Sequence, residues 1–333
     1  MNRINQLASC SNHNNYINFW KFEMDKILLV IGLICSLSHS GFALVELNCS
    51  VANSKDGIFT FTIPTTSRIG DFNMFFVQQE ITRLHPWAVT AMYNYLNNEH
   101  NISRIDNFRP YTCEGLNQTE CGTTFRMTPE QQAYSGRTSF DRGHLQPSHP
   151  FTFERDANDK TFYCFNIAPQ EPFTNQQPWS LVESRVLTYF SGRAGYIITG
   201  IGDQEDLFSP TNVGYIVPNH YWKLVCYKDA AGVTQVVGFI GNNTLLRAND
   251  VAEQDARKAS TYLPRSQQEI INTMNINRVH LFQEAWVGGE TYLLEGRSED
   301  RLPSADECTF KRDLSPEVRQ EWATYIGGFS KLE

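Results

Sequence analysis

Alternation of hydrophobic and polar residues predicts that short strands make up much of this chain. Successive side chains of a strand point to opposite faces, so a period of two indicates a strand with one buried face. Residues 44–70 alternate weakly and predict one or two strands ending at Pro64. The other predicted strands are 71–79, 196–202, 213–217, 220–227 and 233–241.

Helical spacing occurs between and after these strands. Ser315 and Pro316 are typical of an N-cap followed by proline at the first helical position. The spacing in 86–96 fits a helix and a strand equally well. The predicted helices are 181–190, continuing a helix that begins near Asn175, then 250–263, 266–274 and 315–325.

The remaining long segment, 97–133, is polar and without periodicity, which predicts a surface loop. Composition does not shift in a linker-like way anywhere in 44–333. We therefore expect one α+β domain there, with a helical extension at its C-terminal end.

The first 43 residues predict a targeting segment. Ile27–Leu37 is an apolar run preceded by Lys26 and followed by the small-x-small pattern Gly41-Phe42-Ala43. The run is shorter than the roughly 20 residues of a transmembrane helix. We expect a signal peptide ending near Ala43, secretion, and no stable membrane association after cleavage. A start at Met24 would give a signal peptide of ordinary length, and an uncleaved signal anchor is the alternative.

Cysteine usage fits an oxidising compartment. Cys10 and Cys35 lie in the targeting segment, and the six other cysteines form no CxxC pair and no zinc-ligand spacing. They predict disulfides, of which Cys113–Cys121, closing a small loop, is the pair we expect. Four N-x-S/T sequons fit a secreted glycoprotein, at Asn48, Asn101, Asn117 and Asn242.

The net charge of the chain argues against one class of function. The net charge of −8 counts against a protein that coats nucleic acid through bulk positive charge. It is compatible with an enzyme that has a locally basic cleft.

One stretch, 134–183, places polar side chains among aromatic and aliphatic neighbours. Gly143 directly precedes His144, where a missing side chain would let a ligand approach the backbone. This grouping predicts a catalytic site for phosphodiester hydrolysis. Its polar residues are Asp141, Arg142, His144, Asn166, Gln170, Asn175 and Glu183.

Phosphodiester hydrolysis needs a base that activates water, a cation at the phosphate, and donors for the developing charge. His144 has a suitable intrinsic pKa for the first role, although a lone histidine is more often structural. Mg²⁺ prefers oxygen ligands and keeps several waters, so one side-chain oxygen plus phosphate can hold it.

Asn175 and Glu183 are eight residues apart, which corresponds to roughly 12 Å of helical rise. Both cannot ligate one ion directly, so Glu183 would act through metal-bound water. The alternative is that Asn175 caps the helix and Glu183 is a solvated surface residue.

Two segments, FDRGHL (140–145) and TFYCFNIAPQEPFTNQQPWSLVE (161–183), together resemble the DNA/RNA non-specific endonucleases, a family that includes secreted bacterial nucleases and mitochondrial endonuclease G. The family signature is DRGH, then N-[IV]-x-PQ, then N-Q-x-x-W, then Glu eight residues after that Asn. Each of these positions is filled here. The resemblance implies a domain core over about 59–294.

The resemblance also implies a ββα-metal (His-Me finger) fold, with a central, mainly antiparallel sheet flanked by helices. His144 is then the general base, and Asn175 is the protein ligand of Mg²⁺, with Mn²⁺ or another divalent cation as alternatives. Glu183 orders the metal-bound waters, and Arg142 stabilises phosphate charge. The residues with supporting roles are Asp141, Asn166 and Gln170.

The family also places an arginine upstream of DRGH, shortly before an aromatic residue. Arg104, before Phe108, is our candidate, with Arg109 as its rival. The cysteine pair in this region and the predicted signal peptide resemble the secreted animal endonuclease-domain-containing branch.

The sequence thus predicts a secreted, Mg²⁺-dependent non-specific endonuclease whose substrate is DNA, RNA or both. A nucleic-acid-binding protein with the same fold but weak or no activity is the alternative, although the chain keeps both His144 and Asn175. A serine hydrolase is disfavoured because no GxSxG-type nucleophile elbow occurs.

Overall fold

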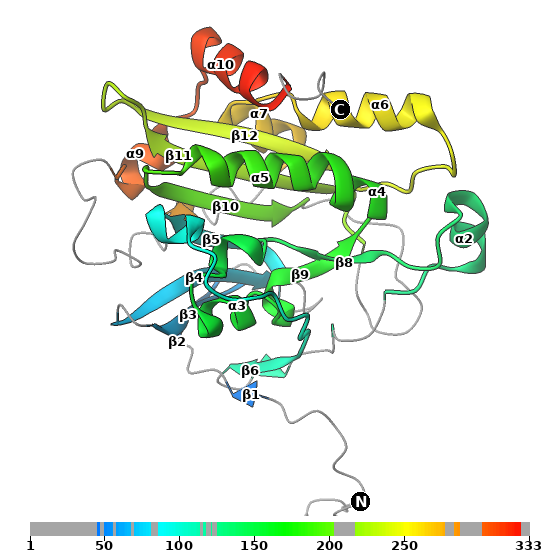
Figure 1. The fold of residues 1–333 in the computed structure, drawn as a ribbon, viewed down its shortest axis with the longest axis horizontal. Coiled ribbons are helices and arrows are strands. Elements are labelled where there is room, and N and C mark those ends of the chain that lie inside the picture. Colours follow the sequence, from blue (N-terminus) through cyan, green and yellow to red (C-terminus); the bar gives the residue numbers. More distant parts are fainter. Residues whose placement is uncertain are drawn as a thin grey trace, which may run out of the picture. The chain divides into compact units, whose positions relative to one another are not determined.

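A seven-stranded antiparallel sheet forms the centre of the computed structural model (Figure 1). The strand order is β12-β11-β10-β5-β4-β3-β2. The strands are β2 (Ser50–Lys55), β3 (Ile58–Ser67), β4 (Gly70–Glu80), β5 (Pro86–Tyr93), β10 (Gly195–Ile201), β11 (His220–Lys228) and β12 (Thr234–Asn242). Within the unit Leu44–Glu333, the structure describes residues 45–46, 50–55, 58–67, 70–80, 86–113, 116–117, 121, 125–202, 217–276, 283–286 and 302–327.

The sheet confirms most of the predicted strands and decides the ambiguous one. Residues 86–93 form β5, which pairs with β4 on one side and β10 on the other, so its apolar residues cover both faces of the sheet. Pro64 does not end β3. It lies at a register shift in the β3–β4 pairing, where the missing N–H of proline is tolerated. Most of the predicted strand 213–217 falls outside the described residues.

Two cores lie on the two faces of the sheet because side chains alternate along its strands. In β10, Ile197 and Ile201 belong to one core, while Tyr196 and Ile198 belong to the other. Helices flank both faces, which confirms the predicted α+β architecture. The first core receives Val182 from α5 and Trp322 from α10, and the second receives Ile270 and Ile271 from α7 and Ala305 and Cys308 from α9.

Most of the described helices begin at caps that satisfy some of their first free N–H groups. The hydroxyl of Ser266 accepts a hydrogen bond from the backbone N–H of Glu269, and the carboxylate of Glu269 accepts one from the backbone N–H of Ser266, a capping box that starts α7. The helices are α2 (Pro129–Ser135), α3 (Arg155–Lys160), α4 (Pro172–Thr174), α5 (Ser180–Tyr189), α6 (Val251–Thr261), α7 (Gln267–Thr273), α9 (Ala305–Phe310) and α10 (Pro316–Gly327). The short 3₁₀ segments are η1 (Tyr95–Asn98), η2 (His149–Phe151) and η3 (Cys164–Asn166).

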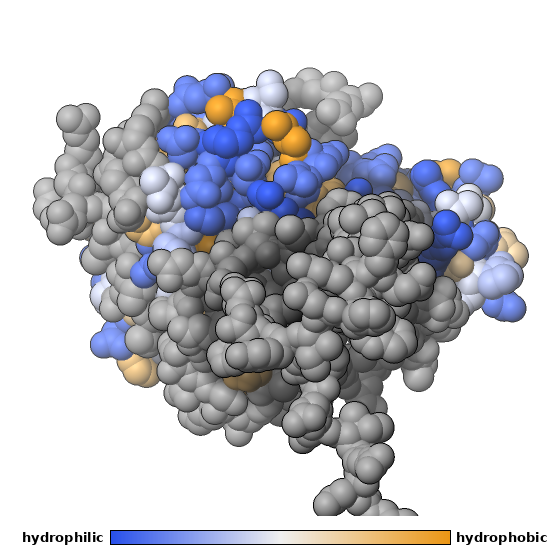
Figure 2. Space-filling model, turned by 90° about the horizontal axis from the view of Figure 1, so that it is seen from below, coloured by the Kyte–Doolittle hydropathy of each residue, from blue (hydrophilic) through white to orange (hydrophobic). Residues whose placement is uncertain are grey.

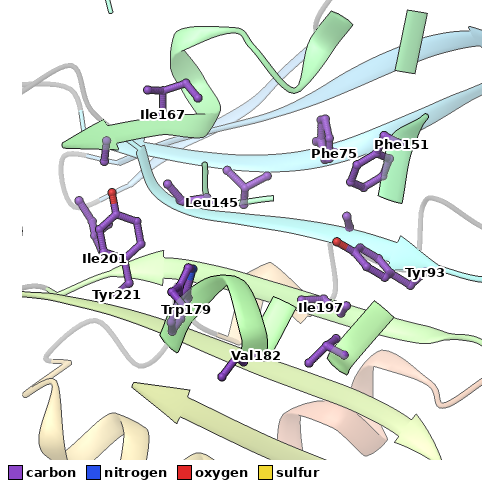
Figure 3. Packing of buried hydrophobic residues seen from close by; sticks show 14 of the residues in the cluster. Phe75, Tyr93, Leu145, Phe151, Ile167, Trp179, Val182, Ile197, Ile201 and Tyr221 are labelled. Carbon is purple, nitrogen blue, oxygen red and sulfur yellow. The ribbon is translucent and has the colours of Figure 1, made fainter. Parts of the chain in front are cut away.

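A separate two-stranded hairpin and one helical run carry the sequence signature. Strand β8 (Asp141–His144) pairs antiparallel with β9 (Ile167–Gln170), so that Asp141 lies opposite Gln170 and His144 opposite Ile167. The chain then runs through α4, the π-helical segment η4 (Asn175–Trp179) and α5. Figure 3 shows Trp179 and Val182 of this run among the buried side chains beside the sheet.

The region 97–133 is only partly the surface loop that its polarity predicts, since 101–107 are mostly exposed and lie outside helices and strands. It contains β6 (Tyr111–Cys113) and β7 (Leu116–Asn117), which form a small sheet with β1 (Val45–Glu46), and it also contains most of α2. Tyr111 and Phe125 are fully buried. Single buried aromatic residues, too sparse to give a periodicity, hold this region against the core.

The expected Cys113–Cys121 disulfide is wrong. Cys121 is bonded to Cys164, just before β9, and Cys226 of β11 is bonded to Cys308 of α9. Short sequence separation favoured the expected pair, whereas the fold brings together cysteines that are 43 and 82 residues apart. The second bond ties the C-terminal helices to the central sheet.

None of the helices that the structure describes has both the length and the apolar character needed to cross a bilayer. The predicted signal peptide, 1–43, lies outside the described residues and stays a prediction. On the side shown in Figure 2, the described surface is mainly hydrophilic, with scattered hydrophobic side chains.

Candidate active site

A pocket of about 360 Å³ opens between the β8–β9 hairpin, the α4–α5 run and the loop before β6. It brings together the five residues with predicted catalytic or metal-binding roles. Polar and apolar side chains share its lining. The lining residues are Arg104, Arg142, His144, Pro147, Ser148, His149, Pro150, Asn175, Gln176, Ser180, Glu183, Ser184 and Leu187.

His144, the last residue of β8, is held between two aromatic rings. Its ring centroid lies 5.5 Å from that of Phe108 and 5.0 Å from that of Phe162. Burial, with the positive charges of Arg104 and Arg142, lowers the pKa of His144 from 6.5 to about 3. The imidazole is therefore neutral at physiological pH and able to accept a proton.

The same two rings carry the arginines. The guanidinium of Arg142 lies 3.7 Å from the centroid of Phe108, and that of Arg104 lies 5.3 Å from the centroid of Phe162. The side chain of Arg104 is half exposed, and its Nε is 2.6 Å from Oδ1 of Asp106. Each of the two arginines that line the pocket therefore packs against an aromatic ring.

Arg109, the rival candidate, lies elsewhere. Its guanidinium packs 4.7 Å from the ring centroid of Tyr163 and lies 3.6 Å from a carboxylate oxygen of Asp159. It is not among the residues that line the pocket. The geometry therefore favours Arg104 as the upstream site arginine.

Asn175 lies inside the helical run and does not cap it. The helix starts three residues before Asn175, where the carboxylate of Glu171 accepts a hydrogen bond from the backbone of Thr174. In the π-helical segment, the N–H of Ser180 bonds to the carbonyl of Asn175, five residues back. The proline inside this segment, Pro178, has no N–H for an ordinary helical bond, which accounts for the wider turn.

Asp141 fixes the amide of Asn175. Its Oδ2 accepts hydrogen bonds from Nδ2 of Asn175 at 2.9 Å and from Nε2 of Gln176 at 2.8 Å. A carboxylate only accepts, so the NH₂ group of Asn175 must face Asp141 and its Oδ1 must point away. Asp141 thus orients the amide oxygen that a hard cation requires.

Glu183 lies two helical turns further on and lines the same pocket. Its Oε1 is buried and has no hydrogen-bond partner among the described residues. Burial raises the pKa of Glu183 to about 7, and the positive charge of Lys223, 3.9 Å away, opposes this rise. The solvated-surface alternative therefore does not hold, since the carboxylate is largely buried beside a cation.

The predicted supporting residues divide into two cases. Asn166 braces the segment after His144, since its amide donates to the carbonyls of Gln146 and Thr161 and accepts from the backbone of Gln146. Gln170 differs from expectation, because neither polar atom of its amide finds a partner among the described residues.

The role expected for Gly143 is also wrong. A Cβ at this position would lie 2.4 Å from Oε1 of Gln170 and 2.9 Å from the hydroxyl of Tyr221. The space left by glycine is thus filled from the interior of the protein and does not admit a ligand. Glycine is needed here because Gln170 and Tyr221 pack directly against the β8 backbone.

The structure adds residues to the site that had no predicted role, including Phe108, which served only to place Arg104. The rings of Phe108 and Phe162 pack against the histidine and the two arginines. Single aromatic residues in loops give no periodic pattern from which this role could be predicted. Gln176 shares the Asp141 carboxylate with Asn175. Lys223 had a visible signal, since it is a charged residue within the otherwise apolar run YWKLVC of β11.

Comparisons with known proteins show which family this chain resembles. The family model described as DNA/RNA non-specific endonuclease matches residues 89–270. A nuclease from Nostoc sp. is 31% identical over 150 residues, covering 45% of this chain and 50% of that protein. Human mitochondrial endonuclease G is 30% identical over 159 residues, covering 42% of this chain and 52% of that protein.

The chain therefore spans about half the length of these curated relatives. A solved structure of an EndoG/EndoGI complex matches with a TM-score of 0.43 and 16% identity, over 62% of this chain and 85% of that chain. The family model covers more than half of the chain and includes the hairpin, the helical run and the pocket residues from Arg104 to Glu183. The chain belongs to the DNA/RNA non-specific endonuclease family.

Proposed function

We propose that this protein is a secreted endonuclease that depends on a divalent cation, Mg²⁺ above all, and hydrolyses phosphodiester bonds of DNA, RNA or both. One observation carries the proposal. A neutral histidine and two arginines face the same pocket as an oriented amide oxygen and a buried carboxylate. This set supplies a base, phosphate-binding cations and hard oxygen ligands within one site.

His144 is the general base. We assign the role to Nδ1, because Nε2 is buried without a partner among the described residues. Nδ1 takes a proton from the water that attacks phosphorus. Bound phosphate offsets the charges of Arg104 and Arg142, so the pKa of His144 rises when substrate binds and the imidazole becomes a better proton acceptor.

Arg142 and Arg104 hold the phosphate oxygens and stabilise the charge that develops on them. Both are positioned by aromatic rings of the protein. Contacts to phosphate carry no information about base identity. A site built on these contacts cleaves with little sequence preference.

The oxygens of Asn175 and Glu183 fit a hard cation. Within the described part of the chain, no group of three or more His, Cys, Asp or Glu side chains could hold a metal ion, so a site here depends on few protein ligands. Mg²⁺, which keeps most of its waters, suits Oδ1 of Asn175 as ligand, with Glu183 ordering those waters. When bound, it would supply charge stabilisation at the phosphate and at the leaving 3′ oxygen.

Secretion is supported by the apolar run before Ala43 and by the disulfides of the described domain. The sequon at Asn101 lies on an exposed residue. Expression of the full chain in a secretory host, followed by N-terminal sequencing and glycosidase treatment of the medium, tests this part. Retention of the intact N-terminus inside the cell would contradict it.

The direct test of activity is incubation with supercoiled plasmid and with RNA, with and without EDTA. We expect cleavage that EDTA abolishes, and loss of about 100- to 10,000-fold activity in His144→Ala, the range for removal of a general base. His220→Ala, a histidine of β11 outside the pocket lining, is the matched control and should cleave normally.

The alternative function is a binding protein of the same fold. Tight binding of nucleic acid by the wild-type protein without cleavage, at any Mg²⁺ or Mn²⁺ concentration, would favour it. EDTA-resistant cleavage would remove the metal from the mechanism. Near-normal activity of His144→Ala would remove His144 as base.

A further inference from the structure

A buried lysine of the central sheet reaches the back of the pocket. The side chain of Lys223 is 2% exposed, and its Nζ lies 3.9 Å from Oε1 of Glu183. The ammonium also donates hydrogen bonds to the hydroxyl of Thr199 and, at 3.4 Å, to the backbone carbonyl of Leu145. These contacts lie on β10, on α5 and on the segment that follows β8.

The partners of Lys223 include both sequence segments that form the pocket. Leu145 directly follows His144, and Glu183 belongs to the helical run that carries Asn175. The ammonium also lies 5.5 Å from the ring centroid of Trp179, in the same helical run. One side chain from the sheet therefore connects the base and the metal-binding helix.

Burying a lysine to hold two elements together costs free energy, because its ammonium group must be desolvated. An apolar residue of similar volume would pack the same space without the cost of desolvating an ammonium group. Hydrophobic packing between the helical run and β11 is already present, since the ring centroids of Trp179 and Tyr221 are 6.0 Å apart (Figure 3). Packing alone therefore does not require a charged side chain here. The charge on which the ammonium of Lys223 can act is the carboxylate of Glu183, 3.9 Å away.

The buried pair Arg257–Glu171 provides a comparison within the same molecule. Arg257 also bonds to Thr174, to the carbonyl of Thr244 and to Glu253, and neither Arg257 nor Glu171 lines the pocket. That pair ties α6 to the start of the helical run. By contrast, Glu183 has a buried oxygen without a hydrogen-bond partner among the described residues, and its side chain lines the pocket.

We propose that Lys223 is a positioning residue for the reaction. Its charge holds the carboxylate of Glu183 in place for metal-bound water, and its hydrogen bonds to Thr199 and Leu145 keep the ammonium in position to do so. The inference rests on the proposed nuclease function and adds a residue outside the family signature. Lys223 does not touch substrate.

A double-mutant cycle tests this role. The variants are Lys223→Met, Glu183→Gln and the double variant, each assayed for kcat and KM on plasmid at saturating Mg²⁺, with unfolding temperature measured in parallel. We expect Lys223→Met to lower kcat by about 10- to 100-fold with little change in KM, the range for residues that orient a metal site. The double variant should be within about threefold of Glu183→Gln alone, because the two residues act as a unit.

Lys228→Met is the matched control. Lys228 lies on the same strand and forms an ion pair with Glu307, 3.4 Å away and outside the pocket lining. It should keep wild-type kcat. If Lys223→Met alone is too unstable to assay, the double variant carries the test, since it leaves no uncompensated charge and should still show the kcat of Glu183→Gln.

Wild-type kcat in Lys223→Met, or losses that multiply fully in the double variant, would overturn the role of Lys223. Either result leaves the proposed function intact if Glu183→Gln is impaired. Absence of cleavage by the wild-type protein would instead refute the proposed function.

Discussion

The two walls of the pocket are built in opposite ways. The histidine wall (Arg104, Arg142 and His144) is cationic and stands on two aromatic rings, and its environment lowers the pKa of the histidine to about 3. The carboxylate wall (Asn175 and Glu183) is formed by one helical run, and its environment raises the pKa of the glutamate to about 7.

With walls of opposite character, one pocket can bind both the phosphate and the metal ion. Burial and the nearby arginines keep the histidine neutral, so it can take a proton, and the charges of the arginines suit an anionic phosphate. Lys223 offsets only part of the effect of burial on the carboxylate of Glu183, and a hydrated cation in the pocket would add positive charge. The histidine wall attracts the negatively charged phosphate, and the carboxylate wall attracts the positively charged metal ion.

The largest effect that separates the walls should come from Asn175→Ala. Loss of the oriented amide oxygen removes the proposed protein ligand, and charge stabilisation of several kcal/mol at a metal corresponds to a loss on the order of 1000-fold. Plasmid cleavage at increasing Mg²⁺ measures it, with Asn272→Ala on the surface of α7 as control. Activity above a tenth of wild type would show that Asn175 is not the ligand.

Arg142→Ala tests the electrostatics of the histidine wall. We expect kcat/KM to fall by about 10- to 100-fold through loss of a donor to the developing phosphate charge. The same change removes a positive charge near His144, so the pKa of His144 should rise towards its ordinary value. An NMR titration of the His144 ring in the metal-free protein measures the shift, and an unchanged or lower pKa would contradict the account.

The carboxylate wall predicts that pH and Mg²⁺ are linked. Glu183 must lose its proton to order metal-bound water, so activity should rise with pH through the pKa of about 7. Mg²⁺ favours the ionised form, and higher Mg²⁺ should therefore move the midpoint to lower pH. Cleavage rates over pH 5–9 at several Mg²⁺ concentrations check this, and a midpoint that does not move with Mg²⁺ would contradict it.

The smallest effect should come from Asp141→Asn. The new amide oxygen can still accept a hydrogen bond from Asn175, but the charge that favours this orientation is lost. We expect a loss of about tenfold, the lower end for residues that orient metal ligands. A loss as large as that of Asn175→Ala would mean that Asp141 has a direct role in the chemistry.

Much of the fold was accessible from the sequence because its strands are regular. Alternation located β11, the turn at 229–232 located its partner β12, and apolar runs located β4 and β10. The signature likewise located His144, Asn175 and Glu183, because the residue types needed for the chemistry follow one another along the hairpin and the helical run.

The parts that failed depend on contacts distant in sequence. The partner of Cys121 is Cys164, and only the fold shows that these two lie together. Gly143 faces Gln170 and Tyr221, so its role follows from packing behind the strand. Lys223 comes from a strand far from the signature, and its contact with Glu183 requires the tertiary structure.

In the proposed mechanism, the histidine wall takes up the proton and the carboxylate wall binds the metal. Calorimetric titration of Mn²⁺, in the absence of nucleic acid, into the wild type, His144→Ala and Asn175→Ala tests it directly. We predict that wild type and His144→Ala bind the ion with similar affinity and that Asn175→Ala loses binding. Equal loss of binding in His144→Ala, or intact binding in Asn175→Ala, would contradict the claim.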